Sequence, residues 1–224
     1  MKRVLLGWSS GKDSAWALHV LHADREVEVV GLLTTLNGSV QRVAMHGVRL
    51  ELVERQAAAA RLPLTTVDLP WPCSNEQYEQ LMAGVVARAK GDGVTHMAFG
   101  DLFLEDVRAY RERQLHGTGI EPLFPIWCSA SETASLADEM IDAGLRAVIT
   151  CVDTEQIDRS FLGREFDRSL LQELPPSADR CGERGEFHSF CYACPAFDRA
   201  IDVELGEIVD RDRFQFIDCA PKLP

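Results

Sequence analysis

Apolar residues in the first half of the chain follow two alternating spacings. Runs rich in Val and Leu at residues 4–8, 27–33 and 64–69, and a shorter run at 95–99, are typical of buried strands. Between these runs, apolar residues recur every three or four positions, as they do on the buried face of a helix. Strands that alternate with helices in this way predict an α/β fold, in which a parallel sheet has helices on both faces.

Two helices are also marked by capping signals. Ser74 and Gln77 have the spacing of a capping box, and Ser129 and Glu132 repeat it before a helical pattern that stops at Gly144. The clearest helical face in the chain follows the first of these signals and consists of Tyr78, Leu81, Met82, Val85 and Ala89.

The pattern of apolar residues changes near residue 125. Residues 147–152 read as a further strand, and apolar residues alternate through the tail after residue 185. This pattern favours a small, partly antiparallel unit. We therefore expect two domains, one over residues 1–125 and a smaller one over residues 126–224.

Composition sets limits on the partners and the compartment. The chain has 224 residues and a formal net charge of −12, which argues against a broad nucleic-acid-binding surface. The apolar run after Met1 is too short for a signal peptide, and no stretch approaches the roughly 18 apolar residues of a membrane span. The seven cysteines, with scattered spacing, fit a reducing compartment. We therefore expect a soluble cytoplasmic protein that binds neither nucleic acid nor membranes.

The stretch Ser-Ser-Gly-Lys-Asp-Ser at residues 9–14 stands between the first strand and the first helix. The first turn of a helix offers free backbone N–H groups and the positive end of the helix dipole, which attract phosphate. Serine hydroxyls and a lysine add donors and positive charge, and an aspartate can reach magnesium. An ordinary turn that caps a helix is the alternative. The expected phosphate-binding residues are Ser9, Ser10, Gly11, Lys12, Asp13 and Ser14.

This stretch resembles the PP-loop, Ser-Gly-Gly-x-Asp-Ser, of the N-type ATP pyrophosphatases, with Ser10 at the position of the second residue, usually glycine. It lacks the pattern of a Walker A loop. Further stretches match, in the same order, the diphthine–ammonia ligase family of that superfamily and its bacterial and archaeal relatives. These stretches are Met45-His46-Gly47, Gly100-Asp101 followed by Arg108 and Glu112, and Gly-Glu-Arg-Gly-Glu-Phe-His-Ser at 182–189.

The resemblance implies a five-stranded parallel nucleotide-binding domain, of the adenine nucleotide alpha hydrolase-like type, and a smaller α+β substrate domain. It also implies an ATP-dependent ligase. A substrate carboxylate attacks the α-phosphorus of ATP, pyrophosphate leaves, and ammonia then displaces AMP to give an amide. The implied cofactors are ATP and Mg²⁺, and the implied partners are ammonium and a carboxylate on a small molecule or a modified protein side chain. The oligomeric state is open, and a homodimer is compatible with the sequence.

The same resemblance assigns the ATP side of the site. Lys12 neutralises charge on the phosphates, and Asp13 and Asp101 hold Mg²⁺, a cation that prefers oxygen ligands. The other implied ATP-binding residues are Thr34, His46 and Gly100.

On the substrate side, Arg108 is expected to clamp the carboxylate, with Glu112 beside it. Glu183, Glu186 and His188 are expected to bind ammonium or take its proton, histidine being the side chain best poised for this at neutral pH. Each residue also has a plainer interpretation. Arg108 and Glu112 are spaced as a surface helix pair, the glutamates as solvated turn residues, and the histidine as an ordinary strand residue.

Two other functions stay open. Cys191 and Cys194, with Cys181 and His188, could bind zinc, or the pair could carry sulfur in a tRNA sulfur transferase, although we favour two partly buried strand cysteines. An ATP sensor without turnover would have the same architecture.

Overall fold

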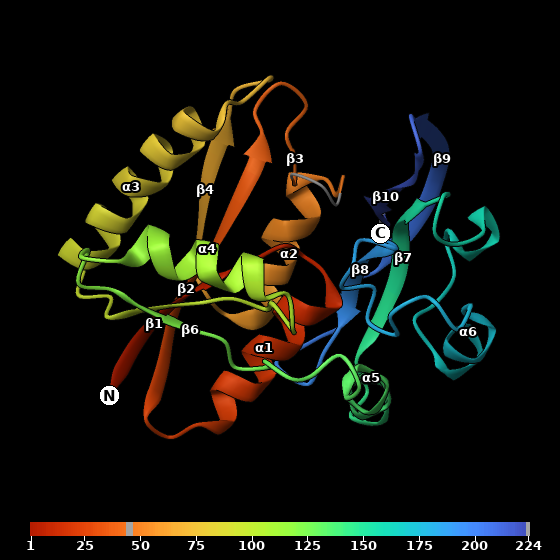
Figure 1. Ribbon diagram of the computed structural model, residues 1–224, viewed down its shortest axis with the longest axis horizontal. Helices are drawn as coiled ribbons and strands as arrows, with labels where there is room; N and C mark the ends of the chain where they lie inside the picture. Colours follow the sequence, from red (N-terminus) through yellow and green to blue (C-terminus); the bar gives the residue numbers. More distant parts are fainter. Residues whose placement is uncertain (44–46, 223–224) are drawn as a thin grey trace.

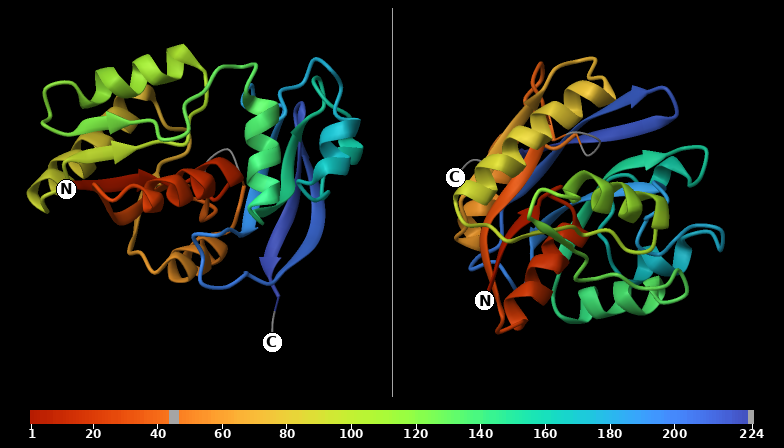
Figure 2. Two further views of the ribbon diagram at one scale, coloured as in Figure 1. Left: turned by 90° about the horizontal axis from the view of Figure 1, so that it is seen from below. Right: turned by 60° about the vertical axis from the view of Figure 1, so that its left-hand side comes forward.

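The computed structural model describes residues 1–43 and 47–222, which form two sheets side by side (Figures 1 and 2). The larger sheet has five parallel strands in the spatial order β4-β2-β1-β5-β6, which confirms the expected parallel architecture. A short strand, β3, pairs antiparallel with the end of β2. The strands are β1 (Lys2–Gly7), β2 (Val27–Asn37), β3 (Arg42–Val43), β4 (Leu64–Leu69), β5 (His96–Ala98) and β6 (Glu121–Leu123).

Helices cover both faces of this sheet because side chains alternate between the faces along each strand. On β1, Val4 and Leu6 share a buried cluster with α1 (Lys12–Ala23) and α2 (Leu50–Ala60). The intervening Leu5 packs on the opposite face, with α3 (Asn75–Gly91) and the end of α4 (Glu105–Leu115). The capping box of α3 is confirmed, because Ser74 Oγ accepts from the Gln77 N–H and the Gln77 side chain accepts from the Ser74 N–H.

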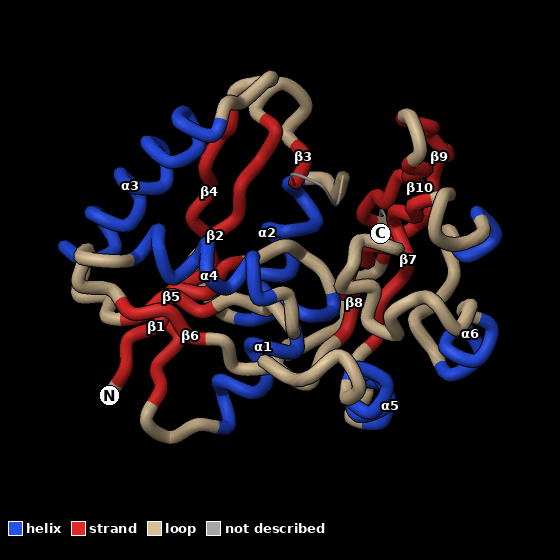
Figure 3. The backbone as a smooth tube through the Cα atoms, in the orientation of Figure 1, coloured by secondary structure: helices blue, strands red, loops and turns tan. Residues whose placement is uncertain are grey.

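The smaller sheet is antiparallel, with the strand order β8-β7-β10-β9, and confirms the expected α+β unit (Figure 3). Its strands are β7 (Arg146–Asp153), β8 (Phe187–Ala193), β9 (Val203–Arg211) and β10 (Phe214–Pro221). The unit also contains helices α5 (Thr133–Asp142) and α6 (Arg168–Glu173) and a 3₁₀ turn, η1 (Arg159–Phe161).

Helix α5 begins differently from the capping box that the sequence predicts. Its N-cap is Glu132, with no side-chain cap. Only half of the box forms: the Glu132 carboxylate accepts from the Ser129 N–H at 2.7 Å, but it also takes the Ser129 hydroxyl, again at 2.7 Å. The carboxylate therefore captures the group that would have capped the helix.

The two sheets share one core. A single buried cluster runs from α1 and α2 to strands β7 and β8 and helix α5. The domain boundary near residue 125 stays a prediction, since the buried side chains continue across it. None of the helices over the described residues has both the length and the apolarity that a membrane crossing requires.

Candidate active site

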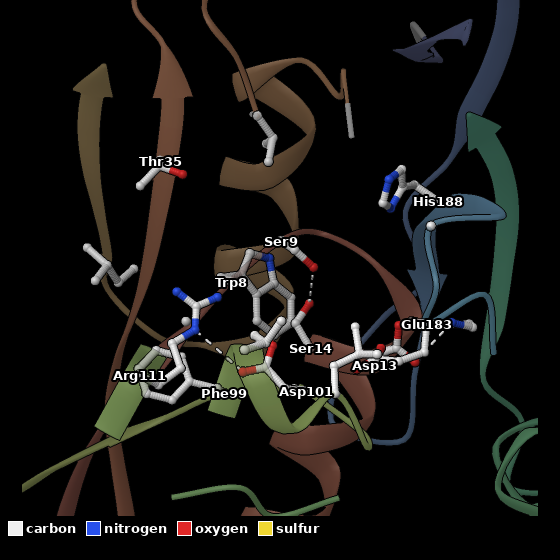
Figure 4. A pocket seen from close by; sticks show the side chains of 18 of the residues that line it. Trp8, Ser9, Asp13, Ser14, Thr35, Phe99, Asp101, Arg111, Glu183 and His188 are labelled. Atoms are coloured by element: carbon white, nitrogen blue, oxygen red, sulfur yellow. Dashed lines mark hydrogen bonds and ion pairs between the residues drawn. The ribbon is translucent and has the colours of Figure 1, made fainter. Parts of the chain in front are cut away.

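A cavity of about 350 Å³ lies at the carboxyl ends of β1 and β5, where the larger sheet meets β8 (Figure 4). Its lining includes the turn into α1 with Ser9, the residues after β5 with Asp101, and the loop before β8 with Glu183. Ligands of parallel α/β sheets bind at this edge. Residues that the sequence singles out in three separate stretches thus face one space.

The turn from β1 into α1 is built to receive an anion. Gly11 is the N-cap of α1, and its extended backbone directs the first turn of the helix toward the cavity. The Ser14 hydroxyl donates to the Gly11 carbonyl at 3.0 Å and lies 3.3 Å from the Ser9 hydroxyl. Ser9, Lys12, Asp13 and Ser14 line the cavity, whereas Ser10 and Gly11 lie beneath it.

Ser10 adopts a left-handed backbone conformation, with φ of +69°. This conformation favours glycine, and it accounts for the glycine that the PP-loop pattern has at this position. The Ser10 carbonyl accepts from the Cys191 N–H of β8 at 2.9 Å, which ties the turn to the smaller sheet. Its hydroxyl is buried and has no hydrogen-bond partner among the described residues.

Gln56 of α2, which no sequence motif signals, holds the turn from below. Its fully buried amide accepts from Trp8 Nε1 at 2.8 Å. It donates to the carbonyls of Ser10 at 2.9 Å and Cys191 at 2.6 Å. One side chain thereby joins β1, the phosphate-binding turn and β8. A lone glutamine in a helical pattern gives no hint of this role, which arises only when the three segments meet.

Lys12 does not point at the space where phosphates would lie. Its ammonium contacts both carboxylate oxygens of Asp13, at 2.9 and 2.8 Å, and donates to the Cys181 carbonyl. It lies between the rings of Phe166 and Phe187, 5.4 Å from each centre, with the side chain 2% exposed. Burial alone lowers the pKa of Lys12, but Asp13 raises it to a net value above the usual one, so the ammonium stays charged.

Asp13 and Asp101 face the cavity as partly exposed carboxylates. Gly100 packs directly on α1, since a Cβ there would lie 3.0 Å from backbone atoms of Asp13 and Ser14, and this contact brings the segment that carries Asp101 to the start of α1. No group of three or more acidic, histidine or cysteine side chains able to hold a metal occurs among the described residues. The donors fit Mg²⁺, which typically uses one or two protein carboxylates and completes its shell with phosphate oxygens and water.

Glu183 is the titratable group best poised near neutral pH. Its carboxylate accepts from the Leu102 N–H at 2.8 Å. Burial, followed by the negative charge of Asp13, raises the pKa of Glu183 to about 7. A carboxylate with this pKa can exchange a proton with a ligand under physiological conditions.

Comparisons with known proteins agree with this geometry. Residues 1–122 match the diphthamide synthase N-terminal domain, and residues 132–219 match the diphthamide synthase C-terminal domain. The chain belongs to the diphthamide synthase family. It is 25% identical to human diphthine–ammonia ligase over 227 residues, which cover 90% of this chain and 82% of that protein. It is 26% identical to the Bos taurus diphthine–ammonia ligase over 153 residues, which cover 66% of this chain and 57% of that protein.

In this member of the diphthamide synthase family, Glu186 lies beneath the cavity, whereas His188 lines it. Glu186 is buried beneath the cavity, where its carboxylate accepts from the N–H groups of Asp179 at 2.7 Å and Arg184 at 3.0 Å. It therefore shapes the loop that carries Glu183. His188 lines the cavity, but burial lowers its pKa to about 4, so its imidazole is neutral and weakly basic. Of the three expected proton acceptors, only Glu183 and His188 line the cavity, and their pKa values favour Glu183.

The expected carboxylate clamp lies outside the cavity, and a neighbouring arginine lies inside it. Arg108 pairs with Glu112 at 2.9 Å and packs over Trp127, as in the plainer interpretation of a surface pair. Arg111, one turn further along α4, lines the cavity and contacts Asp101 Oδ2 at 3.4 Å. The motif spacing locates the helix, but the direction of its side chains depends on how the helix is docked.

Two ATP-binding expectations remain. Thr34 is buried on the far side of β2, and its neighbour Thr35 lines the cavity instead, because side chains alternate along a strand. His46 lies outside the described residues.

Cys191 and Cys194, the cysteine pair, are buried in the shared core, where the Cys194 thiol donates to the Ala15 carbonyl at 3.4 Å.

Proposed function

We propose that the protein is an ATP-dependent, AMP-forming ligase that activates a carboxylate and converts it to an amide with ammonia. Membership of the diphthamide synthase family supports a ligase, as do the relatives that bear the name diphthine–ammonia ligase. The observation that carries the proposal is the meeting of the α1 N-terminus, Asp101 and Glu183 around one cavity. The carboxylate substrate itself stays open.

The chemistry of the lining supports a position for ATP. In the proposed complex, its phosphates lie against Ser9, Ser14 and the first turn of α1, whose groups suit an anion. Its base lies toward Leu33 and Thr35 of β2. Asp13 and Asp101 would hold Mg²⁺, which supplies positive charge to the phosphates when bound. Lys12 fixes the carboxylate of Asp13 in place from below.

The proposed reaction has two steps. A substrate carboxylate oxygen bonds to the α-phosphorus as the bond to the bridging oxygen breaks, and pyrophosphate leaves. Ammonia then attacks the acyl carbon, AMP leaves, and a proton of the nitrogen passes to the carboxylate of Glu183. Glu183 is suited to this transfer, since its pKa of about 7 makes it a stronger base than an ordinary carboxylate. Positioning and charge stabilisation account for most of the rate.

A product assay tests the proposal. The protein is incubated with ATP, Mg²⁺ and ammonium, with either a metabolite extract or a soluble protein fraction, and the nucleotides are separated by chromatography. We expect AMP and pyrophosphate that depend on ammonium and on one of the two fractions. Asp13→Ala should abolish the signal, whereas Asp138→Ala, on the exposed surface of α5, should retain it. Formation of ADP and phosphate would overturn the mechanism.

Sulfur transfer receives no support from the cysteines. A persulfide carrier needs a thiol that meets its substrate, and Cys191 and Cys194 are both buried. Cys191→Ser with Cys194→Ser should therefore leave AMP formation in place.

A further inference from the structure

A second cavity, of about 340 Å³, adjoins the first one between α3 and α4. Both helices lie on the same face of the sheet (Figure 1), and the Gln114 side-chain amide donates to Glu79 between them at 3.0 Å. Ala83 and Ala87, one turn apart on α3, leave the space between the helices unfilled. Larger side chains at these two exposed positions would narrow the cavity.

The lining of this second cavity is mainly apolar. Val86 and Leu115 form its walls, Met97 and Phe99 extend from β5, and Lys90 lies at its edge. The Lys90 ammonium already donates to the Thr118 carbonyl at 2.6 Å. A space of this size with an apolar lining and few polar groups is typical of a site for an organic ligand.

The two cavities share a wall. Tyr78, Met82, Met97, Phe99 and Arg111 line both of them. The two cavities therefore adjoin along these side chains, and Arg111 borders both of them.

Arg111 stands at the junction as the available cation. Its guanidinium lies 4.8 Å from the centre of the Phe99 ring, and its Nε contacts Asp101 at 3.4 Å. No described residue pairs with its two terminal nitrogens. Lys12, the other cationic side chain of the first cavity, is held by Asp13. A planar guanidinium whose two terminal nitrogens face the cavity side by side is suited to a carboxylate.

We propose that the second cavity binds the apolar body of the carboxylate substrate while Arg111 binds its carboxylate. The substrate class is thus an amphipathic carboxylate with an aromatic or branched aliphatic group. That the bound carboxylate is the reacting substrate rests on the proposed function. That the site binds such a carboxylate does not.

Binding measurements without turnover test it. The probes are 4-phenylbutyrate and 4-phenylbutyramide, titrated calorimetrically into the protein saturated with α,β-methylene ATP and Mg²⁺. We expect the carboxylate to bind at least tenfold more tightly than the amide. Ala83→Phe should weaken the carboxylate at least tenfold and leave the affinity for the nucleotide analogue within twofold. Gly84→Phe is the matched control, because a side chain there enters open space on the same helix.

Arg111→Lys should remove most of the preference for carboxylate over amide. If Ala83→Phe does not fold, Ala87→Phe carries the same test from one turn further along α3. The proposal is overturned if neither probe binds, if Ala83→Phe leaves probe binding unchanged, or if it weakens the nucleotide analogue, because the cavity would then hold the base. Absence of AMP in the product assay, with these binding results intact, would instead overturn the ligase function alone.

Discussion

The carboxylate of Glu183 accepts a hydrogen bond at 2.8 Å from the backbone N–H of Leu102, so the loop before β8 rests on the end of β5. The acid comes from the smaller unit and the donor from the larger one. The group that we propose as proton acceptor thus lies where the two sheets meet.

Glu183 should make stability depend on pH. Its folded pKa of about 7 exceeds its ordinary value of 4.5, so between these values the folded chain binds more protons than the unfolded chain. The contribution of Glu183 to the free energy of unfolding should therefore fall by about 1–3 kcal/mol as pH rises from 4.5 to 7. The lowered pKa of His188 acts in the opposite direction, so the contribution is measured as the difference between the protein and its Glu183→Gln variant in denaturant titrations at pH 5 and pH 8. This difference should change with pH, whereas the difference for Glu139→Gln, on the exposed surface of α5, should not.

Lys12→Met should destabilise the fold as well as impair ATP binding. The substitution leaves the Asp13 carboxylate without its partner. Because this carboxylate is partly exposed, we expect a loss below the roughly 3–5 kcal/mol that is typical of a fully buried pair. Thermal unfolding measures the loss, and the double variant with Asp13→Asn should recover much of it. A variant of unchanged stability with weak ATP binding would show instead that Lys12 serves only the phosphates.

Gln56→Met should loosen the phosphate-binding turn. The variant keeps the shape of the side chain but leaves the Trp8 N–H and the carbonyls of Ser10 and Cys191 without this partner. We expect a loss of about 2–4 kcal/mol in the free energy of unfolding, together with weaker ATP binding. Gln114→Met, which breaks an exposed bridge, is the control and should cost little. Equal effects of the two variants would contradict the proposed role.

Ser10→Gly should stabilise the protein. Glycine removes the strain of the left-handed backbone and also removes the buried hydroxyl. The greater conformational entropy of glycine in the unfolded chain offsets part of this stabilisation. The net gain should be about 0.5–1 kcal/mol. Ser10→Ala removes the hydroxyl but keeps the strain, so it should gain less. Chemical denaturation of the three proteins provides the ranking, and equal stability of the two variants would show that strain is unimportant.

Local patterns predicted local structure, and they failed where distant segments decide the outcome. The run at 64–69 coincides with β4, and Ser74 with Gln77 caps α3, because each signal is contained within a few residues. Thr34 was expected at the ATP site, but β2 turns that side chain to the far face and presents its neighbour. The phase of a long strand depends on its partners, which the run itself does not reveal.

The substrate side shows the same limit. The family resemblance implies Arg108 as the carboxylate clamp, yet the docking of α4 turns Arg111 toward the cavity. No local pattern marks Gln56, because its three partners come from separate parts of the chain. The motifs located the site, but the identity of the contacting side chains depends on packing between elements.

The bond from Cys191 to the Ser10 carbonyl has a consequence for how this family can diverge. It is made by the main chain, and Gln56 likewise meets the main-chain oxygens of both residues. Hydrogen bonds between main-chain groups fix the position of a strand, and they form whatever side chains the strand carries. Homologues can therefore exchange residue 191 for any small residue without moving the turn, so the cysteine is expendable although its place in the strand is not.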